Sequence, residues 1–158
     1  MRDKFVVGLL IGLVANIPKM LLDIILYTTG FSRFFCWHVT GGVILSPKWL
    51  STPGGYLIGG VMDFIFAGFL GVLGAYTVWL VREQGRWLFL KALGFSLFIW
   101  LFLCIMVVEK ASMWPLLTDP RHAYQTFIVH QLWGVVFAFL IARYGREAIM
   151  GNGAQGHS

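Results

Sequence analysis

Four long apolar stretches, separated by shorter segments that hold most of the charges, set the pattern of the chain. They cover approximately residues 5–27, 56–81, 88–108 and 123–144. Each is long enough to cross a hydrocarbon core of about 30 Å as a helix, and a backbone in lipid must satisfy its own hydrogen bonds. We therefore expect an all-α fold, an integral membrane four-helix bundle that forms a single domain over residues 1–150.

The composition of the 158 residues agrees with this pattern. Hydrophobic residues make up 58% of the chain and charged residues only 12%, whereas a soluble domain carries about 25% charged residues. These values exclude an ordinary water-soluble globule, an intrinsically disordered chain and a disulfide-stapled secreted domain. The small and polar residues at 151–158 predict a disordered tail.

Basic residues predict the orientation, because they concentrate in the cytoplasmic loops of membrane proteins. With four spans both ends of the chain share one side. That side holds seven basic residues and the opposite side four, namely Arg2, Lys4, Arg82, Arg86, Lys91, Arg143 and Arg146 against Arg33, Lys48, Lys110 and Arg121. We expect cytoplasmic termini in a cytoplasmic (inner) membrane. No basic residues cluster on a soluble face, so we expect no nucleic-acid partner.

The connection at 30–55 is unusually aromatic for a loop outside the membrane. It contains Phe31, Phe34, Phe35, Trp37 and Trp49, and aromatic side chains prefer the membrane–water interface. The sequence predicts an aromatic-rich interfacial loop with a short helix near residues 32–45. A re-entrant segment is the alternative.

Small residues at helical spacing predict close helix packing. Gly8 and Gly12 form one GxxxG pair, and Gly55 and Gly59 form another. Such pairs let two backbones approach each other in lipid. The partner is either another helix of this chain or a second copy in a homo-oligomer.

Ionisable side chains inside the apolar stretches are the strongest indication of a site, because each costs at least about 2.5 kcal/mol at mid-membrane. Lys19, Asp23, Asp63 and His130 are of this kind. Lys19 and Asp23 are spaced i, i+4 and so share a helix face, and Asn16 lies one turn before Lys19. Pro18 lacks an N–H, which predicts a hinge at this point in the first span.

Counted along the helices, Lys19, Asp63 and His130 all fall in the outer half of the membrane. We therefore expect these charges, from three helices, to converge in a pocket open to the outside. Each residue also has a plainer interpretation. Asp23 could be solvated, Lys19 could extend to the interface, Asp63 could form a structural salt bridge with Lys19, and His130 could be a hydrogen-bonded packing residue.

Other chemistry is not indicated. Cys36 and Cys104 lack redox or zinc spacing, although a disulfide between them is an open alternative. Ligation of a haem by His38 and His130 has no further support. Glu109, Lys110, Asp119, Arg121 and His122 are interpreted as interface charges. We expect no resident cofactor and no metal, and an enzyme is less expected than a non-catalytic protein.

Two segments resemble small bacterial inner-membrane proteins of the YagU-like kind. One is the run Gly8-Leu9-Leu10-Ile11-Gly12-Leu13-Val14-Ala15 with the lysine at Lys19, and the other is His130-Gln131-Leu132-Trp133-Gly134 with the basic exit at Arg143 and Arg146. The resemblance implies a cytoplasmic-membrane protein connected with acid tolerance. It carries over to Lys19 and His130 alone.

The leading functional hypothesis is a buried ionisable site that binds or conducts protons or a small cation. Burial and charge pairing shift protonation equilibria, so the pairs could rearrange near neutral pH. The alternative is a non-catalytic accessory or scaffold subunit of a larger membrane complex. A third hypothesis is a membrane enzyme that acts on a lipid or quinone at the aromatic connection.

Overall fold

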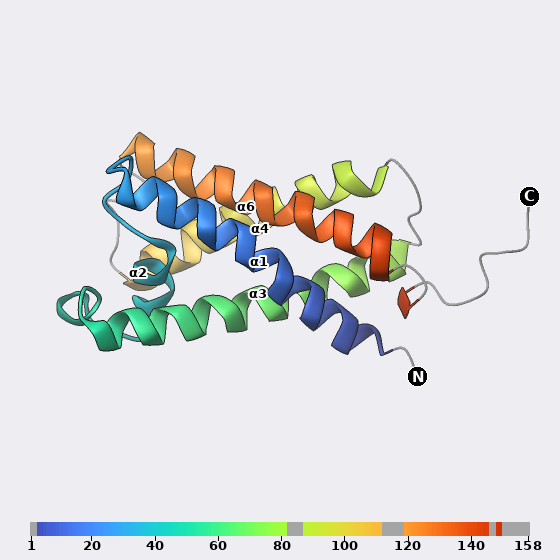
Figure 1. Cartoon of the computed structure of the whole chain (residues 1–158), viewed down its shortest axis with the longest axis horizontal. Helices are drawn as coiled ribbons and strands as arrows, with labels where there is room; N and C mark the ends of the chain where they lie inside the picture. The colour runs from blue at the N-terminus through green and yellow to red at the C-terminus, as the bar shows by residue number, and fades with distance from the viewer. Residues whose placement is uncertain (1–2, 82–86, 112–118, 146–147, 150–158) are drawn as a thin grey trace, which may run out of the picture.

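The computed structural model describes residues 3–81, 87–111, 119–145 and 148–149, and every regular element among them is helical. Four long helices lie side by side along one axis (Figure 1). Two short elements, α2 and η1, fill the connection between α1 and α3, and the turn η2 continues α6. The elements are α1 (Lys4–Thr28), α2 (Cys36–Gly41), η1 (Pro47–Trp49), α3 (Pro53–Val81), α4 (Trp87–Ala111), α6 (Pro120–Leu140) and η2 (Ile141–Gly145).

The long helices follow the predicted apolar stretches, and the all-α prediction is confirmed for the described residues. Three of the described segments, α1, α3 and α6 continued by η2, are long and apolar enough to cross a membrane. In α4 the apolar segment found among the described residues is shorter, Trp87–Phe102. The predicted tail at 151–158 lies outside the described residues.

The ends of α1 follow from local chemistry. The Asp3 carboxylate accepts a hydrogen bond from the backbone N–H of Phe5 at 2.8 Å, which caps the first turn. The helix continues through Pro18 as one element to Thr28. The chain then reverses at Gly30, whose φ of +74° is open to glycine but strained for other residues. This turn directs the aromatic connection back over the end of the bundle.

Glycines bring α1 and α3 into backbone contact. A Cβ at Gly12 would lie 2.4 Å from the carbonyl oxygen of Ala67, and one at Gly71 would lie 2.3 Å from that of Gly8. Only glycine permits so close a crossing. Gly8 and Gly12 therefore pack against another helix of the same chain, which is the first of the two interpretations.

Helix α1 lies between α3 and α6, and α4 packs on the far side of α6. The indole N–H of Trp133 donates to the carbonyl of Gly12 at 3.2 Å, which joins α6 to α1. An apolar core surrounds this contact. Its buried members are Ile11, Ala15, Ala75, Leu88, Ala92, Trp133, Phe137, Ala138, Ile141 and Ile149. The interior near α2 is polar instead, so the two halves of the bundle differ in chemistry.

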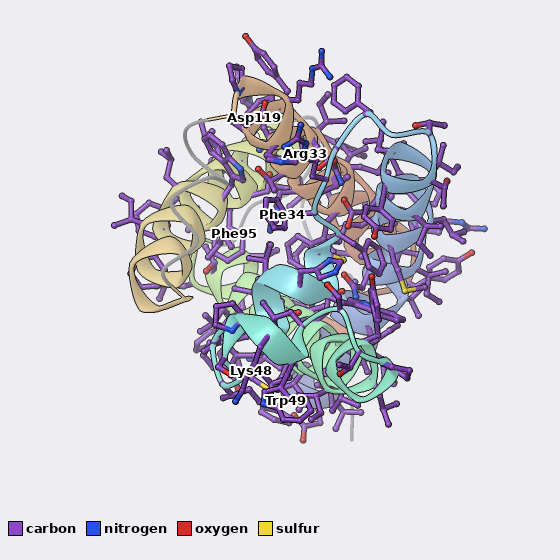
Figure 2. All side chains as sticks on the ribbon, turned by 90° about the vertical axis from the view of Figure 1, so that its left-hand side faces the viewer. Arg33, Phe34, Lys48, Trp49, Phe95 and Asp119 are labelled. Carbon is purple, nitrogen blue, oxygen red and sulfur yellow. The ribbon has the colours of Figure 1, made fainter. Side chains whose placement is uncertain are left out.

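The short helix α2 covers that polar half. It is shorter than the helix predicted near residues 32–45, and it packs against the first turns of α3. A Cβ at Gly59 would lie 2.1 Å from the carbonyl oxygen of Trp37, and the Thr40 hydroxyl donates to the carbonyl of Gly59 at 2.8 Å. The GxxxG pair of Gly55 and Gly59 thus receives this connection. Figure 2 views the bundle from this end.

Candidate functional site

Lys19 and Asp63 form an ion pair between α1 and α3 in the polar half of the bundle. The Lys19 Nζ and Asp63 Oδ1 atoms lie 2.6 Å apart, and the Asn16 side-chain N–H donates to Asp63 Oδ2 at 2.8 Å. The exposed fractions of Lys19 and Asp63 are 5% and 4%, and that of Asn16 is 1%. Three of the predicted site residues therefore meet in one hydrogen-bonded group.

Asp23 belongs to a second group, one turn further along α1. Its Oδ2 accepts the backbone N–H of Cys36 at 2.7 Å, and its Oδ1 accepts the side-chain N–H of Gln125 at 2.5 Å. Asp23 is 1% exposed, so the alternative that it is solvated is wrong. The short helix α2 begins at Cys36. A carboxylate at the first N–H of a helix also interacts favourably with the positive end of the helix dipole.

His130 lies beside both groups, on α6. Its Nδ1 is 2.7 Å from the carbonyl oxygen of Thr126. Because a carbonyl only accepts, Nδ1 carries the proton, and in the neutral ring Nε2 is left as an acceptor. The half-buried ring lies within electrostatic range of Lys19, Asp63 and Asp23.

A pocket open to the outside remains a prediction for these residues. Neither of the two cavities described below is lined by Lys19, Asp23, Asp63 or His130. The short helix α2 packs over the same end of the bundle, against the first turns of α3. His38 on α2 stacks edge-on against Tyr56, with ring centroids 4.9 Å apart, and Tyr27 lies beside the same imidazole.

The formal charges of the two groups do not cancel. Lys19 offsets one of the two carboxylates, Asp63, at 2.6 Å. Asp23 accepts hydrogen bonds from neutral donors, the Cys36 backbone and the Gln125 amide. With all three groups ionised the cluster carries a formal charge of −1. A buried charge without an opposite charge is costly, so this interior is suited to receiving one positive charge.

A neutral His38 stabilises the start of α2. The Phe35 backbone N–H donates to His38 Nδ1 at 3.1 Å, which stabilises the first turn of α2. Burial lowers the pKa of His38 below its ordinary value, so the ring is neutral at pH 7. Burial likewise raises the pKa of the Cys36 thiol, and Cys36 is a free cysteine. The Cys104 side chain lies outside the described residues.

Sequence reasoning missed two polar residues of α6. His122 was interpreted as an interface charge, but it is 2% exposed and hydrogen-bonds through Nδ1 to the Ser32 hydroxyl. Gln125, at 2% exposure, was not singled out. Both lie on the helical stripe that continues through Val129 and Trp133, so this spacing could have identified them. Figure 2 shows the surrounding end, with Phe34 inside the bundle and Asp119 where α6 begins.

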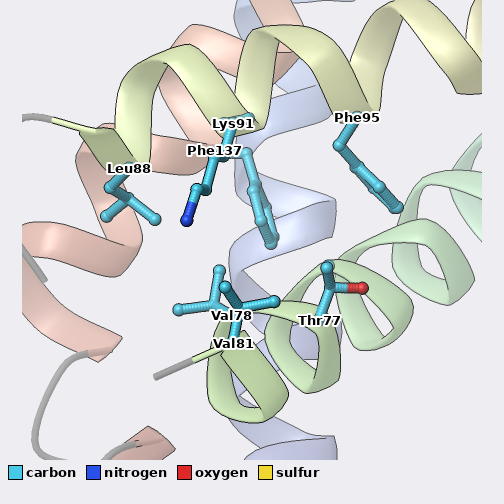
Figure 3. A pocket seen from close by; sticks show the side chains of 9 residues that line it. Thr77, Val78, Val81, Leu88, Lys91, Phe95 and Phe137 are labelled. Atoms are coloured by element: carbon cyan, nitrogen blue, oxygen red, sulfur yellow. The ribbon is translucent and has the colours of Figure 1, made fainter. Parts of the chain in front are cut away.

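Two cavities lie elsewhere. One, of about 40 Å³, separates α3, α4 and α6 at the end opposite α2, and Figure 3 shows Lys91 directed into it towards Val78. The other is an open apolar groove of about 720 Å³ between α1 and α3, with Trp37 among its lining residues. Among the described residues, no group of three or more His, Cys, Asp and Glu side chains is arranged to hold a metal ion.

Comparison of the chain with protein-family models, with curated proteins and with solved structures finds no match.

Proposed function

We propose that this chain is a four-span membrane protein that binds or conducts protons or a small cation at the Asn16–Lys19–Asp63 and Asp23–Gln125 groups. The fourth span in this proposal is α4, which has 25 residues and packs along α6. The excess of basic residues on the side of the membrane that holds both chain ends supports cytoplasmic termini. The site then lies towards the outer face, beneath α2.

The observation that carries the proposal is the second carboxylate. A structural ion pair needs one acid and one base, and Lys19 and Asp63 already satisfy each other at 2.6 Å. Asp23 adds a second buried carboxylate, and its hydrogen-bond donors among the described residues are the uncharged Cys36 backbone and the Gln125 amide. A buried carboxylate is costly unless a positive charge or a proton offsets it, so this group favours a role in binding a positive charge.

The mechanism in this proposal is charge exchange. A proton or cation that enters next to Asp23 brings the cluster from a formal charge of −1 to zero. Lys19, one turn away on the same helix, can then redistribute its contacts between the two carboxylates. Pro18 lies beside Lys19 and lacks the N–H that would restrain this turn, so the expected hinge of α1 coincides with the site.

The experiment is ion flux into liposomes that contain the purified protein. Asp63→Asn removes the partner of Lys19, and His130→Ala removes the neighbouring imidazole. We expect Asp63→Asn to lower the initial flux by at least about tenfold, equivalent to about 1.4 kcal/mol of activation free energy. Asp3→Asn is the matched control, because Asp3 is an exposed carboxylate that caps α1 at the opposite end. Unchanged proton, Na⁺ and K⁺ flux in both site variants would remove the proposal.

The second candidate is a non-catalytic accessory subunit. The apolar groove between α1 and α3 favours it, because Leu9, Leu13 and Phe64 line an open surface of the kind on which helices associate in lipid. Purification from native membranes in mild detergent separates the two candidates. A stoichiometric partner together with absent flux supports the accessory role, and a monomer that conducts excludes it.

A further inference from the structure

Each of the two buried carboxylates is paired with a carboxamide from another helix. Asn16 on α1 donates from its side-chain nitrogen to Asp63 on α3 at 2.8 Å. Gln125 on α6 donates in the same way to Asp23 on α1 at 2.5 Å. All four side chains are at most 4% exposed. The same pair of chemical groups therefore occurs twice in one small interior.

In both pairs the carboxamide oxygen is left over. Asn16 Oδ1 and Gln125 Oε1 are buried, and they have no hydrogen-bond partner among the residues that the structure describes. Their orientation follows from chemistry, because only the NH₂ end of a carboxamide can donate to a carboxylate. An unsatisfied buried acceptor is unfavourable, and this interior holds two of them, one in each pair.

A carboxamide is one of the few side chains that can partner a carboxyl group in both of its protonation states. When the carboxylate is ionised, it accepts from the NH₂ end. When it holds a proton, its O–H must donate, and a half-turn of the carboxamide presents the oxygen as acceptor. A backbone N–H or a charged lysine can only donate. The unused oxygens are thus the acceptors that the protonated states require.

We propose that Asp23–Gln125 and Asp63–Asn16 are two proton-binding stations, in which the carboxamide rotates to match the protonation of its carboxylate. This deepens the proposed function and rests on it, because it identifies the proton, not a metal cation, as the bound species. In the binding step a hydronium ion gives its proton to an Asp23 oxygen, forming an O–H bond and releasing water. No electron is transferred.

The stations share their charged neighbours. Asp23 faces Lys19 on its own helix, Cys36 and His38 on α2, and His130 on α6. Asp63 faces Lys19, Cys36 and His130. Lys19 lies against Asp63 and not against Asp23. One proton on either carboxyl group makes the cluster formally neutral.

The test is infrared difference spectroscopy of the full-length protein in lipid, titrated with acid at constant NaCl. We expect a carbonyl band of a protonated carboxyl group to grow as the pH falls and to be lost in Asp23→Asn. A glutamine carboxamide band should change with it, shift when the glutamine is isotopically labelled, and disappear in Gln125→Leu. Gln131→Leu is the matched control, because Gln131 lies on the same helix but bonds to the Ser96 hydroxyl at 3.0 Å.

The outcomes separate this inference from the proposed function. A carboxyl band without an accompanying carboxamide change overturns the rotation. Carboxylate bands that respond to Na⁺ or K⁺ but not to pH overturn the proton stations, while the proposed function as a cation site survives. If the protein shows no ion flux but keeps its pH-dependent carboxyl and carboxamide bands, the proposed function is overturned and the proton stations survive. If Asp23→Asn or Gln125→Leu fails to fold, Asp63→Asn and Asn16→Leu provide the same comparison at the other station.

Discussion

Removing one partner of the buried ion pair should be far more damaging than removing both charges. In Lys19→Met the Asp63 carboxylate keeps its bond from Asn16 but loses the ammonium at 2.6 Å. At an effective dielectric constant of about 20, two unit charges at that separation attract by about 6 kcal/mol. Part of this offsets the desolvation of the ammonium, which is 5% exposed. We expect a loss of about 3–5 kcal/mol in unfolding free energy.

The double variant Lys19→Met/Asp63→Asn should recover most of that loss. The amide introduced at position 63 can accept from the Asn16 nitrogen and donate to Asn16 Oδ1, which has no partner in the described structure. We expect the double variant to lie within about 1 kcal/mol of the wild type, since apolar or neutral replacements of a buried pair are often tolerated.

The assay is reversible unfolding in mixed micelles with increasing denaturing detergent, followed by circular dichroism. The two single variants and the double variant complete a double-mutant cycle. A coupling of several kcal/mol supports a buried, interacting pair. Additive losses, with the double variant as unstable as the sum of the single variants, would show that Lys19 and Asp63 do not depend on each other.

Three further predictions concern the surroundings of the site. Gly12→Ala should cost about 1–3 kcal/mol by forcing α1 away from the backbone of α3, whereas Gly94→Ala, in open space, should cost nothing in the same detergent unfolding assay. Burial lowers the pKa of His38 in the folded state, so the contribution of the neutral ring to stability should be lost as the pH falls below about 6.5. The measurement is hydrogen exchange at Cys36–Gly41, which should become faster at low pH. Exchange that does not depend on pH would contradict this prediction. Because burial raises the pKa of the Cys36 thiol, a Cys104→Ser variant should react slowly with maleimide at pH 7. Labelling as fast as that of free cysteine would contradict the burial of this thiol.

Sequence reasoning located the charges well because their cost in lipid makes them stand out. Lys19, Asp63 and Asn16 meet as one group, since helical spacing places Asn16 and Lys19 on one face and charge attraction selects Asp63 as the partner. The role of the site is a separate question, which no contact answers by itself. The proton or cation function stays a prediction.

The packing of α2 over the site could not be predicted from the positions of the apolar stretches. Aromatic composition predicts a short helix in this connection, but the packing of that helix depends on whether α3 offers a surface without side chains. Gly59 offers it to Trp37 of α2, and Gly55 offers it to the backbone of Trp49 in η1. Gln125 was missed for a related reason, because an uncharged amide does not stand out by hydropathy. Its partner Asp23 reveals it only in three dimensions.

The most direct measurement is the proton flux into liposomes under an imposed membrane potential, with wild type, Asp63→Asn and Asp23→Asn reconstituted at equal density. The account predicts a flux above that of empty liposomes for the wild type, and values close to empty liposomes for both variants. A wild type indistinguishable from empty liposomes for protons, Na⁺ and K⁺, or two variants that conduct as well as the wild type, would contradict it.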